Sequence, residues 1–249
     1  MKAKLPARWM KSGAVRGGSL STQHGLRIDP HAVSSYVAHP EDRSTRNAVL
    51  LLTDVFGHAS INPQLIADQL AANGYFVVMP DLFDGDPAPA NLDGFDFPAW
   101  RARHQPAAVD PIVAAVLDAM RRGGLGCERV GGVGYCFGAK YVVRNLRGGE
   151  LIDAGFVAHP SFVDAAELRG ITRPLSIAAA EDDYIFPTEK RRESEDILAE
   201  MRATYQLVLY SGTAHGFATR GDLGKRDVKF AKEQAFLQAV RWFDEHVKA

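Results

Sequence analysis

One pentapeptide has the residue pattern of an enzyme nucleophile. Cys136 lies at the centre of Gly134-Tyr135-Cys136-Phe137-Gly138, which has the G-x-S-x-G form with cysteine in place of serine. In this form the nucleophile sits on a sharp turn between a strand and a helix, and the glycines allow the two elements to cross closely. A thiolate at a helix N-terminus is stabilised by the helix dipole. We therefore expect Cys136 to attack a carbonyl carbon, with the backbone N–H of Phe137 facing the carbonyl oxygen.

Two later segments supply an acid and a base in the order that such a nucleophile requires. The apolar run that ends at Ala180 leads into Asp182 and Asp183, and the run that ends at Tyr210 is soon followed by His215. Each segment follows a predicted strand, at the edge where an open α/β sheet builds its sites. His215 would accept the thiol proton and return it to the leaving group, and a carboxylate would orient its ring. The alternative, a glycine-rich turn around an inert buried cysteine, does not account for this order.

Hydrophobic patterning predicts the elements that position these residues. Strands are expected at residues 35–38, 48–53, 75–79, 129–133, 154–158, 175–180 and 205–210. Helices are expected at residues 62–73 and 107–122, after Cys136, after Pro187, and over residues 225–247. This alternation predicts an α/β fold with a mostly parallel, doubly wound sheet and helices on both faces. Residues 84–98, rich in Gly, Pro and Asp, are expected to form a loop over the site.

Length and composition agree with one globular domain. The chain has 249 residues, of which 46% are hydrophobic and 24% charged, and its formal net charge is −1. These values give no indication of a nucleic-acid-binding surface, and no run of about 18 apolar residues predicts a transmembrane helix. We expect a single domain over residues 31–249, preceded by a basic N-terminal extension over residues 1–30. A transit peptide is the alternative for that extension.

The cysteines and histidines outside this pattern predict neither a disulfide nor a metal site. Cys127 and Cys136 are separated by a predicted strand that rises about 3.3 Å per residue, which is too far for a disulfide. Cys127 is therefore assigned to packing. The histidines show no metal-ligand spacing. His159 and His58 each follow a predicted strand, so their side chains could either face the site or have a structural role.

Together these segments resemble the dienelactone hydrolase family of the α/β-hydrolase superfamily. The resemblance rests on the pentapeptide around Cys136, on residues 180–187, on His215-Gly216-Phe217, and on residues 53–57, which are similar to the family's first active-site loop. It extends over residues 45–247. It implies an α/β-hydrolase fold and a hydrolase that cleaves a lactone or small carboxylic ester through an acyl-cysteine intermediate, without a cofactor. It also selects Asp183 over Asp182 as the acid of a Cys136–His215–Asp183 triad.

The same resemblance assigns roles to further residues. The backbone N–H of Val55 would join that of Phe137 in an oxyanion hole. Asp54 would contact the resting nucleophile and control its protonation. The alternative is that Asp54 caps the following helical turn or accepts local loop N–H bonds. Family members that hydrolyse anionic lactones bind the substrate carboxylate with arginines. Three arginines are candidates for this role: Arg220, Arg101 and Arg103.

Other functions remain as alternatives. A broad carboxylesterase or thioesterase would use the same residues, and a non-catalytic α/β-hydrolase-fold binding protein would share the fold. The glycines at 132, 134 and 138 resemble a dinucleotide-binding turn, but their spacing departs from G-x-G-x-x-G and the next predicted strand lacks a terminal acid. We expect a cytoplasmic monomer or weak homodimer that acts on a small molecule and binds neither nucleic acid nor membrane.

Overall fold

The strands that the structure describes form a single sheet. A computed structural model describes residues 24–28, 33–148 and 151–248. The strands within these residues are β1 (His24–Ile28), β2 (Val33–Ala38), β3 (Asn47–Leu52), β4 (Phe76–Pro80), β5 (Arg129–Tyr135), β6 (Ala154–Ala158), β7 (Leu175–Asp182) and β8 (Tyr205–Ala214). Their order in the sheet is β1-β2-β4-β3-β5-β6-β7-β8. Neighbours from β4 to β8 are parallel, whereas β2 is antiparallel to both β1 and β4.

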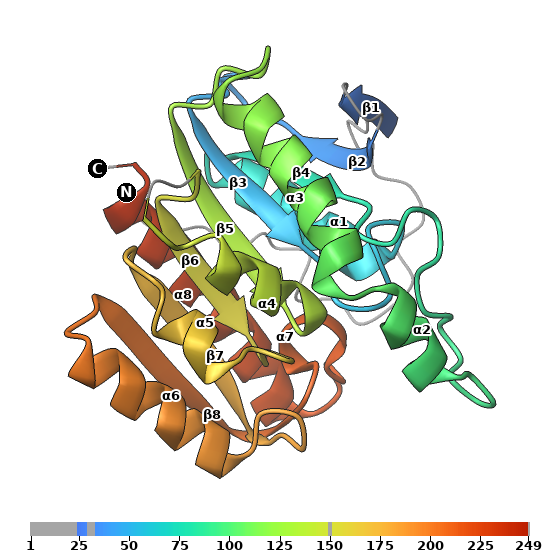
Figure 1. Cartoon of the computed structure of the whole chain (residues 1–249), viewed down its shortest axis with the longest axis vertical. Coiled ribbons are helices and arrows are strands. Elements are labelled where there is room, and N and C mark those ends of the chain that lie inside the picture. Colours follow the sequence, from blue (N-terminus) through green and yellow to red (C-terminus); the bar gives the residue numbers. More distant parts are fainter. Residues whose placement is uncertain (1–23, 29–32, 149–150, 249) are drawn as a thin grey trace.

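Helices cover both faces of this sheet (Figure 1). One apolar cluster includes α1 (Ile61–Ala72), α7 (Phe217–Arg220) and α8 (Arg226–His246). The other includes α2 (Phe97–Arg103), α3 (Pro106–Arg121), α4 (Phe137–Arg144), α5 (Ala165–Leu168) and α6 (Thr188–Glu200). The predicted doubly wound α/β fold is therefore confirmed.

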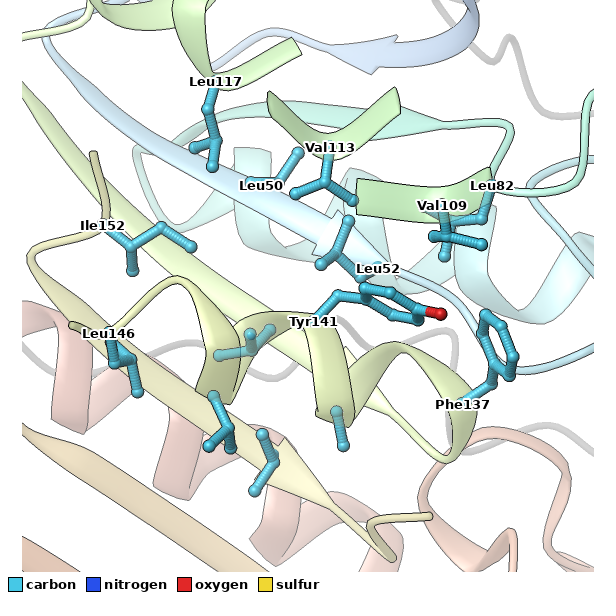
Figure 2. Packing of buried hydrophobic residues seen from close by; sticks show 14 of the residues in the cluster. Leu50, Leu52, Leu82, Val109, Val113, Leu117, Phe137, Tyr141, Leu146 and Ile152 are labelled. Atoms are coloured by element: carbon cyan, nitrogen blue, oxygen red, sulfur yellow. The ribbon is translucent and has the colours of Figure 1, made fainter. Parts of the chain in front are cut away.

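Strand β3 is continuously apolar because both of its faces are buried. Successive side chains of a strand point to opposite faces, so a strand covered on both faces needs an apolar residue at every position. Leu50 and Leu52 belong to the cluster on one face, and Val49 and Leu51 to the cluster on the other. Figure 2 shows Leu50 and Leu52 among the side chains of α3 and α4. Burial of each such side chain stabilises the fold by about 1.5–3 kcal/mol.

The strand order brings the candidate site residues to one edge of the sheet. Strand β5 lies between β3 and β6, and the chain reaches it only after crossing from β4 past β3. This reversal of strand order opens a crevice at the carboxyl ends, where α/β proteins bind ligands. Asp54 closely follows β3 and Cys136 directly follows β5. Asp183 directly follows β7 and His215 directly follows β8.

The seven predicted strands and the longer predicted helices are confirmed, with boundaries that differ by a few residues. Strand β5 runs two residues further than predicted and β8 four further, to Tyr135 and Ala214, so each ends at the residue before a candidate catalytic side chain. The short helices α2, α5 and α7 were not predicted, because helices of four to seven residues show little periodicity.

Strand β1 was not predicted either. It falls within residues 1–30, which the sequence assigns to an N-terminal extension, and it pairs with the edge of β2. Residues 1–23 of that extension lie outside the described residues. Pairing at a sheet edge depends on the neighbouring strand rather than on local sequence alone.

Both cysteines are free thiols. Cys127 is buried, and this burial raises the pKa of its thiol to about 11, as fits a packing residue. Within the described part of the chain, no helix has the length and apolar character needed to cross a membrane.

The crossing of α4 over β3 leads to a stability prediction. A Cβ atom at Gly138 would lie 2.2 Å from the carbonyl oxygen of Leu52. We expect Gly138→Ala to lower the free energy of unfolding by about 1–3 kcal/mol or more, because helix and strand must move apart. Urea denaturation measures this change. Gly124→Ala is the matched control, since a Cβ there meets no atom within 4 Å; equal losses in both variants would contradict the prediction.

Candidate active site

Cys136 occupies a strained turn between β5 and α4. Its backbone has φ 50° and ψ −109°, a conformation that costs a non-glycine residue about 1–3 kcal/mol. Hydrogen bonds hold it there: its N–H donates to the carbonyl of Ala158 (3.1 Å), and its carbonyl accepts from the N–H groups of Ser161 (3.0 Å) and Ala139 (3.2 Å). A Cβ at Gly134 would lie 2.6 Å from the Cα of Ala139, so the turn needs this glycine.

A continuous chain of hydrogen bonds links Cys136, His215 and Asp183. His215 Nε2 lies 3.1 Å from Cys136 Sγ, and His215 Nδ1 lies 2.9 and 2.8 Å from the two carboxylate oxygens of Asp183. The backbone N–H groups of Ile185 and Phe186 both donate to Asp183 Oδ1 at 2.9 Å, which fixes the carboxylate. Asp183 is buried, whereas Asp182 is exposed at the end of β7. The structure thus brings the three predicted triad residues together.

The surroundings favour a charged imidazole in this chain. Burial opposes that charge, but the hydrogen bonds and charges of Asp183 and Cys136 outweigh it and raise the pKa of His215 to about 9. Burial likewise opposes ionisation of Asp183, but the bonds from His215 and the two backbone N–H groups hold the pKa of this carboxyl below its ordinary value. An imidazolium next to the sulfur can donate a hydrogen bond to a thiolate.

Hydrogen bonds hold the backbone near Phe137 and Val55, whose N–H groups are the predicted oxyanion-hole donors. The N–H of Gly138 donates to the carbonyl of Thr53 (3.0 Å), which holds the start of α4 against the loop that follows β3. The carbonyl of Val55 accepts from the N–H of Ala88 (2.9 Å), which orients the Val55 backbone. Within residues 33–148 and 151–248, the N–H groups of Val55 and Phe137 donate to no protein acceptor. They can therefore serve an external oxygen.

Asp54 pairs with Arg220. Its Oδ2 accepts from Arg220 Nη1 (2.9 Å) and from the Thr219 hydroxyl (3.1 Å), and its Oδ1 accepts from the N–H of Phe56 (3.1 Å). The Arg220 guanidinium also lies 4.9 Å from the centre of the Phe56 ring. The family resemblance implies a contact between Asp54 and the nucleophile, with local loop N–H bonds as the alternative. The structure gives Asp54 such a loop hydrogen bond and an ion pair with Arg220.

A cavity of about 320 Å³ lies beside this ion pair. Its size is at the lower end of the range for small-molecule sites. Asp54, Thr219 and Arg220 line it together with apolar side chains, among which are Phe56, Ile61 and Pro63. The cavity therefore combines an apolar wall with a few convergent polar groups.

Two candidate arginines on α2 have partners of their own. The Arg101 guanidinium lies 4.1 Å from the centre of the ring of Phe162, a residue of the loop between β6 and α5. Arg103 forms an exposed ion pair with Asp86 (2.9 Å). The loop predicted over residues 84–98 ends two residues earlier, because α2 begins at Phe97. The indole N–H of Trp100 on α2 donates to the carbonyl of Asp86 in this loop (2.7 Å).

The two candidate histidines lie away from the cavity walls. His58 Nδ1 lies 3.6 Å from Asp81 Oδ1. Burial opposes ionisation of Asp81, but His58 and two backbone N–H groups hold the pKa of this carboxyl below its ordinary value. His159 is fully buried, and its ring centre lies 5.0 Å from that of His215 in an edge-on arrangement. Burial, together with the charges of His215 and Arg220, holds the pKa of His159 far below its ordinary value. His159 therefore packs against the ring of His215 and does not line the cavity.

Sequence reasoning missed three side chains at the site. Ser161 lies 3.2 Å from the sulfur of Cys136, and Thr219 bonds to Asp54. Tyr184 is 84% exposed although its ring centre lies 6.0 Å from that of His215. Ser161 closely follows β6, the parallel neighbour of the strand that carries the nucleophile. This position is the signal that could have identified it.

The described residues contain no group of three or more His, Cys, Asp or Glu side chains arranged to hold a metal ion. The chemistry that these residues can perform is attack of a thiolate on a carbonyl group, assisted by an acid–base histidine and two N–H donors.

Comparison with known proteins shows which family and fold the chain is similar to. The model of the dienelactone hydrolase family matches residues 33–247. "Hydrolase pyvD" of Aspergillus violaceofuscus is 54% identical over 214 residues, which cover 86% of each chain. "Hydrolase tropI" of Talaromyces stipitatus is 51% identical over 246 residues, covering 95% of this chain and 93% of the relative. The "Putative Dienelactone Hydrolase" of Klebsiella pneumoniae has a similar fold, with a TM-score of 0.75 at 17% identity over 90% of this chain and 97% of its own.

The Asp54–Arg220 pair gives the second prediction. We expect a double-mutant cycle with Asp54→Asn and Arg220→Gln to yield a coupling energy of about 1–2 kcal/mol in chemical denaturation, because Asp54 is buried. The exposed Arg103–Asp86 pair, with the same 2.9 Å separation, is the control, and we expect at most about 0.5 kcal/mol for its cycle. Equal coupling in the two cycles would show that burial does not strengthen the Asp54 pair.

Proposed function

This chain belongs to the dienelactone hydrolase family, and we propose that it hydrolyses a lactone or small carboxylic ester through a Cys136–His215–Asp183 triad. A fold alone does not define an activity, so the proposal rests on the site. The observation that carries it is the unbroken contact from Cys136 Sγ through both ring nitrogens of His215 to Asp183. This contact supports assignment of the three side chains as the nucleophile, the base and the group that orients the base, which acyl transfer needs.

The first half-reaction forms an acyl-cysteine. The Cys136 thiolate attacks the ester carbonyl carbon, and the electron pair of the C=O bond moves to oxygen. When this tetrahedral intermediate collapses, the ester C–O bond breaks and His215 Nε2–H gives its proton to the leaving oxygen. Asp183 keeps the proton of Nδ1 in place throughout and stabilises the imidazolium.

The second half-reaction returns the enzyme to its starting state. His215, now neutral, takes a proton from water as the water oxygen attacks the acyl-cysteine carbonyl. The C–S bond then breaks, and the sulfur leaves as a thiolate beside the renewed imidazolium. The sum of the two halves is one ester and one water converted to one acid and one alcohol, or to one hydroxy acid when the substrate is a lactone.

We propose that the backbone N–H groups of Val55 and Phe137 stabilise the oxyanion in both halves. Their freedom from protein acceptors within the described residues supports this role. Loss of one such donor typically costs about 3 kcal/mol of transition-state stabilisation. Because both donors are backbone groups, the crossing of α4 against the end of β3 sets their positions.

The cavity beside Asp54 is proposed to receive the rest of the substrate. Its volume of about 320 Å³ suits a small lactone or ester. Arg220 contributes a cation to its wall and keeps its proposed role as the contact for an acidic group of the substrate. Such a group would compete with Asp54 for the guanidinium, so Asp54 is proposed to act on the nucleophile only indirectly, through Arg220 and the helix that follows His215.

The direct test is hydrolysis of a substrate panel by the wild-type protein and Cys136→Ala. The panel contains a dienelactone, a neutral lactone, p-nitrophenyl acetate and an acyl thioester. We expect turnover to fall by at least about 10⁴-fold in Cys136→Ala on every accepted substrate, because the triad acts as a unit. Preference for the dienelactone would support an anionic lactone, and preference for the thioester would support the thioesterase alternative.

Two results would contradict the proposal. Turnover that survives Cys136→Ala would remove Cys136 as the nucleophile. Absence of wild-type turnover on every panel member, together with no labelling of Cys136 by an active-site reagent, would favour a non-catalytic binding protein. Cys127→Ala is the matched control, because this second thiol is buried in the core and we expect it to leave turnover unchanged.

The raised pKa of His215 predicts the pH dependence. With a pKa of about 9, the imidazolium that protonates the leaving oxygen is present below this value and is lost as the pH rises through it. We expect kcat/KM for an alkyl ester to fall above about pH 9. p-Nitrophenyl acetate should show a flatter limb, because its leaving group departs without a proton. Identical alkaline limbs for both esters would contradict the role of His215 as the acid.

A further inference from the structure

A serine that the triad does not include lies against the nucleophile. Ser161 Oγ is 3.2 Å from Cys136 Sγ, and Ser161 has no exposed surface. Cys136 is itself only 4% exposed, so water cannot surround a thiolate at this position. A buried charge without hydrogen bonds is strongly unfavourable. The negative charge on the sulfur must therefore be balanced by groups of the protein.

The direction of the Ser161 contact follows from its protons. A serine hydroxyl has one hydrogen to donate, and a thiolate has none. Among the residues that the structure describes, Cys136 Sγ is the only hydrogen-bond partner of Ser161 Oγ. When Cys136 is ionised, the hydroxyl hydrogen therefore points to the sulfur.

We propose that Ser161 is a second hydrogen-bond donor to the Cys136 thiolate, beside the imidazolium of His215. This inference rests on the proposed function, in which Cys136 is the nucleophile. The sulfur of an acyl-cysteine carries no charge and accepts hydrogen bonds more weakly than a thiolate. The Ser161 bond therefore strengthens as the C–S bond breaks, and it favours release of the thiolate in the second half-reaction.

The loop after β6 holds the hydroxyl in place. The N–H of Ser161 donates to the carbonyl of Cys136 (3.0 Å), and the N–H of Cys136 donates to the carbonyl of Ala158 (3.1 Å). His159 and Phe162, on either side of Ser161, both have positive φ values, 38° and 61°. Such strained conformations cost about 1–3 kcal/mol each and cluster at functional sites. The donor is thus positioned before the reaction begins and needs no reorganisation.

The experiment measures how fast iodoacetamide alkylates Cys136 at a series of pH values. We expect Ser161→Ala to slow alkylation by about tenfold at pH 6, because the thiolate loses a charge-assisted hydrogen bond. At high pH, where the thiol ionises without help, the two rates should converge. A merely structural defect would lower the rate by a similar factor at all pH values. Cys136→Ala reports any reaction at Cys127 and is subtracted.

A second pair of variants isolates the hydroxyl group. Ser161→Thr keeps the hydroxyl group, and Ser161→Val has nearly the shape of threonine without the hydroxyl. We expect the alkylation profile of the Thr variant to resemble that of the wild type and the profile of the Val variant to resemble that of Ser161→Ala. Ser194→Ala is the matched control for loss of a buried serine hydroxyl. Ser194 lies on α6 and donates to the carbonyl of Lys190 (2.7 Å). We therefore expect Cys136 in Ser194→Ala to be alkylated with the pH profile of the wild type.

The outcomes separate this inference from the proposed function. An unchanged pH profile in Ser161→Ala, or equal profiles in the Thr and Val variants, would overturn the role of Ser161. If Cys136→Ala is inactive in the same preparation, the triad stands without it. If Cys136→Ala keeps its turnover, the proposed function itself fails, whatever the alkylation rates are.

Discussion

Where helix α4 begins, the polypeptide backbone passes so close to β3 that a Cβ atom at Gly138 would lie 2.2 Å from the Leu52 carbonyl oxygen. The N–H of Gly138 donates across this crossing to the carbonyl of Thr53 (3.0 Å), which joins the start of α4 to the loop after β3. Cys136, which directly precedes α4, has its strained conformation at the same turn. The buried side chains around α4, including Phe137 and Tyr141 (Figure 2), stabilise the arrangement against its local strain.

Two neighbouring histidines show how partners rather than burial decide charge. The ring centres of His159 and His215 are 5.0 Å apart, and both side chains are largely removed from solvent. His215 has a carboxylate partner, and its pKa rises to about 9. His159 has no hydrogen-bond partner for either ring nitrogen among the described residues, and its pKa falls far below the ordinary value. A second positive charge is thereby kept away from the imidazolium, where it would be repelled.

The site also separates two buried carboxylates by giving each its own cation. Asp183 pairs with His215 beside the sulfur of Cys136, while Asp54 pairs with Arg220 beside the cavity. Ser161, which is neutral, is the group that contacts the sulfur together with His215. A carboxylate in that place would repel the thiolate, whereas a hydroxyl can donate to it. Among the described residues, His215 is thus the titratable side chain within hydrogen-bond distance of the Cys136 sulfur.

The sequence by itself determined the fold class and the order along the chain of the strands that precede the site residues, because apolar runs and glycine turns are local signals. The pentapeptide around Cys136 and the positions of Asp183 and His215 after strands were visible for the same reason. Only the tertiary structure decided the partners: Asp54 with Arg220, Ser161 with the sulfur, and His159 behind His215. Each of these contacts joins residues from segments that are far apart in the sequence. The distances between them depend on how neighbouring strands pair, and no local pattern of residues predicts that pairing.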